Sequence, residues 1–192
     1  MSRHSTPFEG GIYRTCDNWF GIIPIRETPI KYLEIGVFYG ANVVSCNETY
    51  AKHPLSELYC IDPWEDYNDY SEYKNEQNNI YELFKKNIKS TNNEDKFKIH
   101  KGFSHDIVPN LPNDYFDIIY IDGNHNPEYV LEDAVLCFRK LKSEGYMIFD
   151  DFGWGGPDLT QRGIEAFIKG YRDKLDSKNI VLHNTQIFVK KL

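Results

Sequence analysis

Apolar residues along this chain form two kinds of pattern, short continuous runs and stripes at helical spacing. The short runs are rich in β-branched and aromatic residues, as in buried strands, and predict strands over 32–35, 58–61, 96–100, 116–121 and 146–149. The stripes predict helices over 41–52, about 77–89, 104–111, 127 to a break at Gly145, and 160–171. Repeated strand–helix units imply an α/β fold with a doubly wound, mostly parallel sheet.

The two ends of the chain follow other patterns. Residues 1–30 are rich in Gly and Pro around one apolar cluster, Trp19–Ile23, and predict an irregular N-terminal lead-in with a short helix. Near the other end, Ile180–His183 and Gln186–Val189 are separated by two residues and predict an antiparallel hairpin. We therefore predict a lead-in over 1–30 followed by one domain over 31–192.

Residues 64–79 are polar and aromatic, and this segment is too long for a routine connection between a strand and a helix. Two interpretations fit it equally well. It is either a lid over a site or a solvated insertion.

Composition and charge limit the classes of protein. The chain has 192 residues, enough for one well-buried domain. No stretch approaches the ~18 apolar residues that cross a bilayer, and the first residues have no apolar signal core. The net charge of −7 disfavours nucleic acid as a partner. The four cysteines lack CxxC spacing, so we expect neither a zinc site nor a disulfide framework, and a cytoplasmic protein without nucleic-acid or membrane partners.

A glycine turn follows the first strand and precedes the first helix. Strand, glycine turn and helix in this order form the nucleotide-binding corner of open α/β sheets. Phe38 stands where the second glycine of GxGxxG would admit a pyrophosphate, so a nucleoside ligand without pyrophosphate is favoured over NAD. Glu34 would serve the polar end of that ligand. Asp62, 26 residues after Gly36, would accept hydrogen bonds from ribose hydroxyls. A plain turn is the alternative.

Acidic residues end two further strands. Asp122 follows the strand over 116–121, and Asp150 and Asp151 follow the strand over 146–149. Neighbouring parallel strands present their carboxyl ends to one crevice. Three carboxylates there repel one another by about 4 kcal/mol per close pair at an intermediate dielectric, so they need a cation, shared protons or basic partners. Such oxygen ligands suit Mg²⁺, Ca²⁺ or Mn²⁺.

His125, three residues after Asp122, is a candidate proton acceptor at neutral pH. The alternatives are structural. Asp151 would cap a loop, and His125 would bind backbone near the start of a helix.

These motifs together resemble those of the class I S-adenosylmethionine-dependent methyltransferases. The resemblance covers about residues 31–190 and rests on Leu33–Gly36 with Gly40, Ile61-Asp62, Gly102–Ser104, Asp117–Asp122 and Gly145–Phe149. It implies a Rossmann-like, seven-stranded sheet with one antiparallel strand inserted near its edge, as the C-terminal hairpin requires. The chain departs from the common D-x-G-x-G-x-G form, since Glu34 replaces the first Asp and Val37-Phe38-Tyr39 replace small residues.

Carried over residue by residue, the resemblance implies a cofactor site. Glu34 and Gly36 would flank the methionine part of S-adenosylmethionine. Asp62 would hold the ribose, Trp64 would lie over the adenine, and Ser104 would lie near the adenine amine. The cofactor-binding residues predicted in this way are Glu34, Gly36, Tyr39, Gly40, Asp62, Trp64, Ser104 and Asp122.

The pairing of Asp122-Gly-Asn-His125 with Asp150-Asp151 resembles one branch, the metal-dependent small-molecule O-methyltransferases, including macrocin-type and mycinamicin-type sugar enzymes. The resemblance implies Mg²⁺ at Asp122, Asp150 and Asp151, with His125 and Asp122 as catalytic residues. A divalent ion lowers the pKa of an acceptor hydroxyl and fixes its position. The expected reaction is methyl transfer to a hydroxyl of a small molecule, first of all a sugar or nucleotide sugar.

Other functions fit the same residues. A catechol-type phenol O-methyltransferase, a metal-independent N-methyltransferase and a nucleoside-binding module without catalysis are the alternatives. Phe152–Pro157, with Trp154, suits a substrate loop, since aromatic faces pack on sugar rings and phenols; a rigid turn with a buried Trp is the other interpretation. Arg162 and Trp19 are weaker candidates for the same pocket. The aromatic lead-in also leaves a homo-oligomer open.

Overall fold

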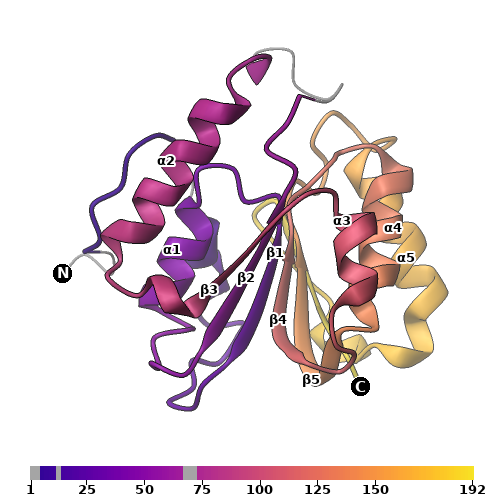
Figure 1. Cartoon of the computed structure of the whole chain (residues 1–192). Helices are drawn as coiled ribbons and strands as arrows, with labels where there is room; N and C mark the ends of the chain where they lie inside the picture. Colours follow the sequence, from indigo (N-terminus) through magenta and orange to yellow (C-terminus); the bar gives the residue numbers. More distant parts are fainter. Residues whose placement is uncertain (1–4, 12–13, 67–72) are drawn as a thin grey trace.

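Seven strands form one sheet in residues 5–11, 14–66 and 73–192, the parts of the chain that the computed structural model describes (Figure 1). The strand order is β3-β2-β1-β4-β5-β7-β6. Strands β1 to β5 pair in parallel, whereas β7 is antiparallel to both β5 and β6. The predicted fold class is confirmed. The strands are β1 (Lys31–Ile35), β2 (Glu57–Asp62), β3 (Phe97–Lys101), β4 (Phe116–Ile121), β5 (Leu141–Phe149), β6 (Val181–His183) and β7 (Gln186–Lys190).

Helices cover both faces of the sheet. Figure 1 shows α1 (Ala41–Glu48) and α2 (Gln77–Ser90) on one side, with α3 (Ser104–Ile107), α4 (Pro127–Phe138) and α5 (Thr160–Tyr171) on the other. Side chains alternate along β1, so that Tyr32 joins one hydrophobic core and Leu33 the other. The 3-10 helices are η1 (Thr15–Trp19), η3 (Glu94–Lys96), η4 (Val108–Asn110), η5 (Arg172–Lys174) and η6 (Ser177–Asn179). In the described residues, no helix is long and apolar enough to cross a membrane.

The N-terminal lead-in contains the short helix that the sequence predicts, η1, and its Trp19 lies in the core. The Trp19 ring is fully buried and lies 5.4 Å from the ring of Tyr120 and 5.5 Å from that of Tyr50. Its Nε1 donates to Oε1 of Gln186 on β7 at 3.1 Å. Trp19 is therefore not a pocket residue, which corrects its candidate role.

Several boundaries differ from the predicted ones. Helix α1 ends at Glu48, four residues early, and β5 begins at Leu141 with Gly145 inside it. Leu141 fits a helical stripe by spacing, but it pairs with Phe116 of β4. The buried Lys140 donates from Nζ to Pro109 O, Leu111 O and Asn113 Oδ1. These hydrogen bonds fix the position of the chain just after α4 ends. Of the predicted insertion over 64–79, residues 67–72 lie outside the described residues.

Candidate active site

A cavity of about 540 Å³ lies at the carboxyl ends of β1, β2, β4 and β5. Strand β1 has β2 on one side and β4 on the other. The strands that follow β1 are therefore added first toward one edge of the sheet and then toward the opposite edge, and the reversal lies next to β1. Open α/β sheets bind ligands at such a switch point. The volume is in the range of small-molecule sites.

The glycine turn after β1 is required by the backbone of β4. Gly36 has φ +79°, and a Cβ there would lie 1.8 Å from the carbonyl oxygen of Asp122. Gly40, the N-cap of α1, has φ +85°, and its Cβ would lie 2.8 Å from the Phe84 ring. Gly36 lines the cavity, whereas Gly40 is absent from the described lining. Close packing of the chain therefore explains both glycines before any ligand is considered.

Asp62 joins the loop after β1 to the loop after β2. Its Oδ2 accepts from the backbone N–H groups of Val37 (2.8 Å) and Phe38 (2.9 Å), and its Oδ1 accepts from that of Trp64 (2.8 Å). Burial raises the pKa of Asp62, and these three N–H groups act against that shift. A carboxylate has about four acceptor positions, so about one is left for the predicted ribose contact.

Trp64 packs behind the residues that line the cavity and does not line the cavity itself. Its side chain is 1% exposed, and its ring lies 4.7 Å from each of the rings of Tyr81 and Phe84 on α2. Its Nε1 donates to Phe38 O at 3.0 Å. Trp64 is absent from the described cavity lining, which corrects the expectation that its ring covers an adenine.

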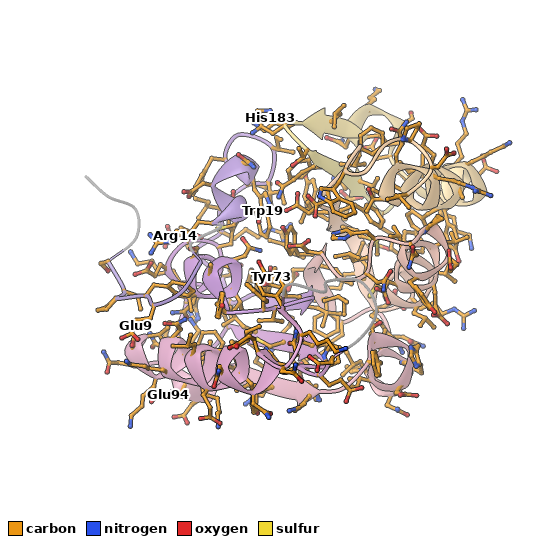
Figure 2. All side chains as sticks on the ribbon, turned by 90° about the horizontal axis from the view of Figure 1, so that it is seen from above. Glu9, Arg14, Trp19, Tyr73, Glu94 and His183 are labelled. Carbon is orange, nitrogen blue, oxygen red and sulfur yellow. The ribbon has the colours of Figure 1, made fainter. Side chains whose placement is uncertain are left out.

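Aromatic rings from two other residues, Phe38 and Tyr73, line the cavity together with the predicted Tyr39. The Phe38 ring lies 4.1 Å from that of Tyr39 and 5.0 Å from that of Tyr73. Seen from above in Figure 2, Tyr73 lies near the centre of the molecule. In the sequence, Phe38 counted only as a departure from two glycine-rich patterns, GxGxxG and D-x-G-x-G-x-G. Its place in the turn, next to Tyr39, was the signal for an aromatic wall.

Ser104 and Arg162 are absent from the described lining. The Ser104 hydroxyl is hydrogen-bonded to Asp133 on α4, where burial raises the pKa of Asp133 to about 7. Arg162 is exposed on α5. Neither the predicted adenine contact of Ser104 nor the pocket role of Arg162 is supported by these positions.

Glu34 is a buried carboxyl group on the cavity wall. It is 1% exposed, and its Oε2 accepts from the Tyr32 hydroxyl (2.5 Å) and from Asn42 Nδ2 (3.3 Å). Burial raises the pKa of Glu34 to about 8. Asn42, which sequence reasoning missed, also accepts from the backbone N–H of Cys16 at 2.7 Å and so connects the lead-in to the site.

Asp122, His125 and Asp151 converge at the other end of the cavity. One potential ligand atom from each lies within 4.8 Å of the others, and His125 Nε2 lies 3.0 Å from Asp151 Oδ2. Burial, together with the nearby Asp150 and Asp151, raises the pKa of Asp122 well above its usual range. Two of the three predicted metal ligands therefore meet His125 here.

Asp150, the third predicted ligand, has both oxygens in hydrogen bonds. Its Oδ2 accepts from the Tyr120 hydroxyl and from Gln186 Nε2 (3.2 Å), and its Oδ1 accepts from the Asp151 N–H (2.8 Å) and the Thr185 hydroxyl (3.3 Å). Asp151 has φ +56°, which turns the two neighbouring carboxyl groups in different directions. Asp150 thus lines the cavity while it is anchored to β4 and β7.

A sequence model described as a methyltransferase domain matches residues 33–152. The chain belongs to this methyltransferase family. The matched segment contains the glycine turn, Asp62 and the Asp122–His125–Asp151 cluster, so the resemblance to class I methyltransferases is confirmed. A mimiviral relative, the uncharacterised protein R132 of Acanthamoeba polyphaga mimivirus, is 36% identical over 69 residues, which cover 30% of this chain and 31% of that protein.

Solved structures share the fold at low sequence identity. The O-methyltransferase TomG from Streptomyces achromogenes, in complex with SAM, superposes with a TM-score of 0.63 at 16% identity, over 84% of this chain and 72% of TomG. MycE, from the mycinamycin biosynthetic pathway and in complex with Mg and SAH, superposes with a TM-score of 0.61 at 16% identity, over 92% of this chain but only 48% of MycE.

Proposed function

We propose that this methyltransferase moves the methyl group of S-adenosylmethionine to a hydroxyl of a small molecule, with a sugar as the first candidate. One observation carries the proposal. A single cavity of about 540 Å³, in a chain of the methyltransferase family, is lined by Glu34, Asp62 and the cluster of Asp122, His125 and Asp151. Its size and the net charge of −7 favour a small-molecule acceptor over nucleic acid.

The cofactor would occupy the end of the cavity formed by β1 and β2. The rings of Phe38, Tyr39 and Tyr73 offer an apolar wall for an adenine, and the remaining acceptor position of Asp62 suits a ribose hydroxyl. Glu34 lies at the end of β1. Burial raises the pKa of Glu34 to about 8, and the positive sulfonium and ammonium groups of the bound cofactor would favour its ionised form, which attracts them. These contacts would orient the donor methyl toward β4 and β5.

A divalent cation fits the cluster at the other end. Two carboxylates and one imidazole, with one ligand atom each within 4.8 Å, form a set that suits Mn²⁺ or Zn²⁺ as well as the expected Mg²⁺. When bound, the ion would lower the pKa of the acceptor hydroxyl. The complex of MycE with Mg supports this proposal by analogy alone.

His125 is the candidate group to take the acceptor proton. Its ring is 5% exposed, lies 4.3 Å from the Trp154 ring, and has Nε2 within 3.0 Å of Asp151 Oδ2. These contacts hold the imidazole in one orientation beside Asp122. A neutral imidazole accepts a proton near physiological pH, which suits a general base for an alcohol. If His125 instead binds the ion, Asp122 or water would take this role.

Calorimetry and methyl-transfer assays with radiolabelled S-adenosylmethionine test the proposal. We expect S-adenosylhomocysteine to bind, label to appear in a sugar acceptor, and EDTA to reduce transfer by at least about tenfold. Transfer that survives EDTA favours the metal-independent N-methyltransferase, and label in a catechol favours the phenol O-methyltransferase. Binding without any transfer leaves a nucleoside-binding module, and no binding refutes the proposal.

A pair of variants separates the two candidate ligand sets. If His125 is a ligand, His125→Ala should lower the affinity for Mn²⁺ by about 10- to 100-fold. If Asp150 is the ligand instead, Asp150→Asn should cause that loss of affinity. Equal loss in both variants would mean that the ion binds all four side chains.

A further inference from the structure

The charge of the cavity limits the acceptor, and this inference rests on the proposed function. Six carboxyl groups line the cavity, and no Lys or Arg side chain does so among residues 5–11, 14–66 and 73–192. His125 is the one basic side chain in that lining. The six are Glu34, Asp62, Asp66, Asp122, Asp150 and Asp151.

The proposed cofactor and cation do not cancel this charge. S-adenosylmethionine adds one net positive charge and a divalent ion adds two, against up to six carboxylates. The cavity is partly enclosed, so its field is less screened than that of an open surface. Phosphate recognition ordinarily uses Arg, Lys or a helix N-terminus with free backbone donors. Near the cavity, the N–H groups of Val37 and Phe38 already donate to Asp62, and the N-terminus of α1, whose Ala41 and Asn42 line the cavity, would be occupied by the carboxylate of the proposed cofactor.

An aromatic side chain completes the acceptor end. Trp154 lines the cavity with 44% of its side chain exposed, and its ring is tilted by 31° against that of His125. The face of an indole packs against the C–H face of a sugar ring and attracts a nearby ammonium group. Trp154 therefore offers a surface for a ring. Asp150 already accepts four hydrogen bonds, so the partner offered to a positive substituent is the second oxygen of Asp151, which supplies one ligand atom to the cluster.

We propose that the acceptor is a ring-bearing alcohol without phosphate or carboxylate groups, and that a sugar with an amine is bound in preference to a neutral one. Nucleotide sugars and sugar phosphates are excluded, because the anionic groups would enter an acidic cavity without basic partners.

Three sugars of different charge test this inference on the full chain saturated with S-adenosylhomocysteine and Mg²⁺. Glucosamine, glucose and glucose 6-phosphate are titrated at slightly acidic pH, where the amine is protonated, and binding is followed by ligand-detected NMR. We expect glucosamine to bind at least about tenfold more tightly than glucose 6-phosphate, with glucose between them. Asp151→Asn should narrow that ratio when both proteins are compared without Mg²⁺, so that loss of the ion does not enter the comparison. Asp158→Asn, an exposed residue of the same loop outside the cavity lining, should leave it unchanged.

The outcomes separate the two proposals. A chain that binds no S-adenosylhomocysteine refutes the proposed function, and the inference falls with it. A chain that binds S-adenosylhomocysteine but binds glucose 6-phosphate and glucosamine with equal affinity refutes the inference alone. An unchanged ratio in Asp151→Asn also contradicts it, since the preference would then not come from the cavity carboxylates.

Discussion

Replacement of Asp62 by Asn should destabilise the empty protein, because the hydrogen bonds of Asp62 join two backbone segments even without a ligand. Its carboxylate accepts three backbone N–H bonds, from Val37, Phe38 and Trp64. An amide of the same shape has only one oxygen. If that oxygen keeps the bonds to Val37 and Phe38, the Trp64 N–H faces an NH₂ group and loses its acceptor.

The expected loss follows from these bonds. An unsatisfied buried donor costs about 1–3 kcal/mol, and the two retained bonds weaken because they are no longer assisted by charge. We expect a total of about 2–4 kcal/mol, which lowers Tm by roughly 5–15 °C in a protein of this size. Thermal unfolding of the empty protein, followed by circular dichroism, measures it.

Asp66→Asn is the matched control, since Asp66 also lines the cavity but is exposed and, among the described residues, accepts from the N–H of Asn75. Its Tm should change by less than about 2 °C. If Asp62→Asn keeps the Tm of the wild type and loses only affinity for S-adenosylhomocysteine, Asp62 acts on the ligand, and its hydrogen bonds to the two backbone segments contribute little to stability.

Three other predictions concern the same end of the sheet. Because burial raises the pKa of Glu34 to about 8 from 4.5, the stability that its proton contributes is present below the unfolded pKa and is lost as the pH rises through the folded one. Between about pH 5 and pH 8, the free energy of unfolding of the wild type, measured with urea, should therefore fall by on the order of a few kcal/mol more than that of Glu34→Gln. Parallel curves of this free energy against pH for the two proteins would contradict the prediction. Gly36→Ala should destabilise by about 3 kcal/mol or more through overlap with the β4 backbone. Gly153→Ala, which has φ +89° and no atom within 4 Å of the new Cβ, should cost only about 1 kcal/mol of strain, and equal losses would refute the overlap. Trp19→Phe should cost about 1–3 kcal/mol, since Gln186 loses a buried donor. A smaller loss from Trp19→Phe in a Gln186→Leu background, where that acceptor is absent, would support this cause, and an equal loss would contradict it.

The succession of strands and helices along the chain and the convergence of the strand ends were predictable from the sequence. Continuous apolar runs alternate with helical stripes, and this alternation requires a parallel sheet whose carboxyl ends share one edge. Glu34, Asp62 and Asp122 each stand at or near the end of such a run, so their common cavity follows from the pattern. The hairpin also follows, because two short strands separated by two residues have little choice of topology.

Two features of the site depend on contacts that no local pattern encodes. Trp64 follows a Pro in a polar segment, and its burial depends on the rings of Tyr81 and Phe84, which reach it from α2. Asp150 and Asp151 are adjacent, and the φ of +56° at Asp151 directs one toward β7 and the other toward His125. A single left-handed Asp is not readable from composition or spacing, since most Asp residues avoid that conformation. The metal ligand set was therefore the least predictable part of the site.

A crystal structure of the full chain with S-adenosylhomocysteine and Mg²⁺ tests the central claim most directly. The account predicts the adenosyl group beside the rings of Phe38 and Tyr39, with its ribose at Asp62, and an ion within bonding distance of Asp122 and Asp151. A cofactor bound elsewhere, or a cavity that holds the cofactor while Asp122 and Asp151 stay without an ion, would contradict it.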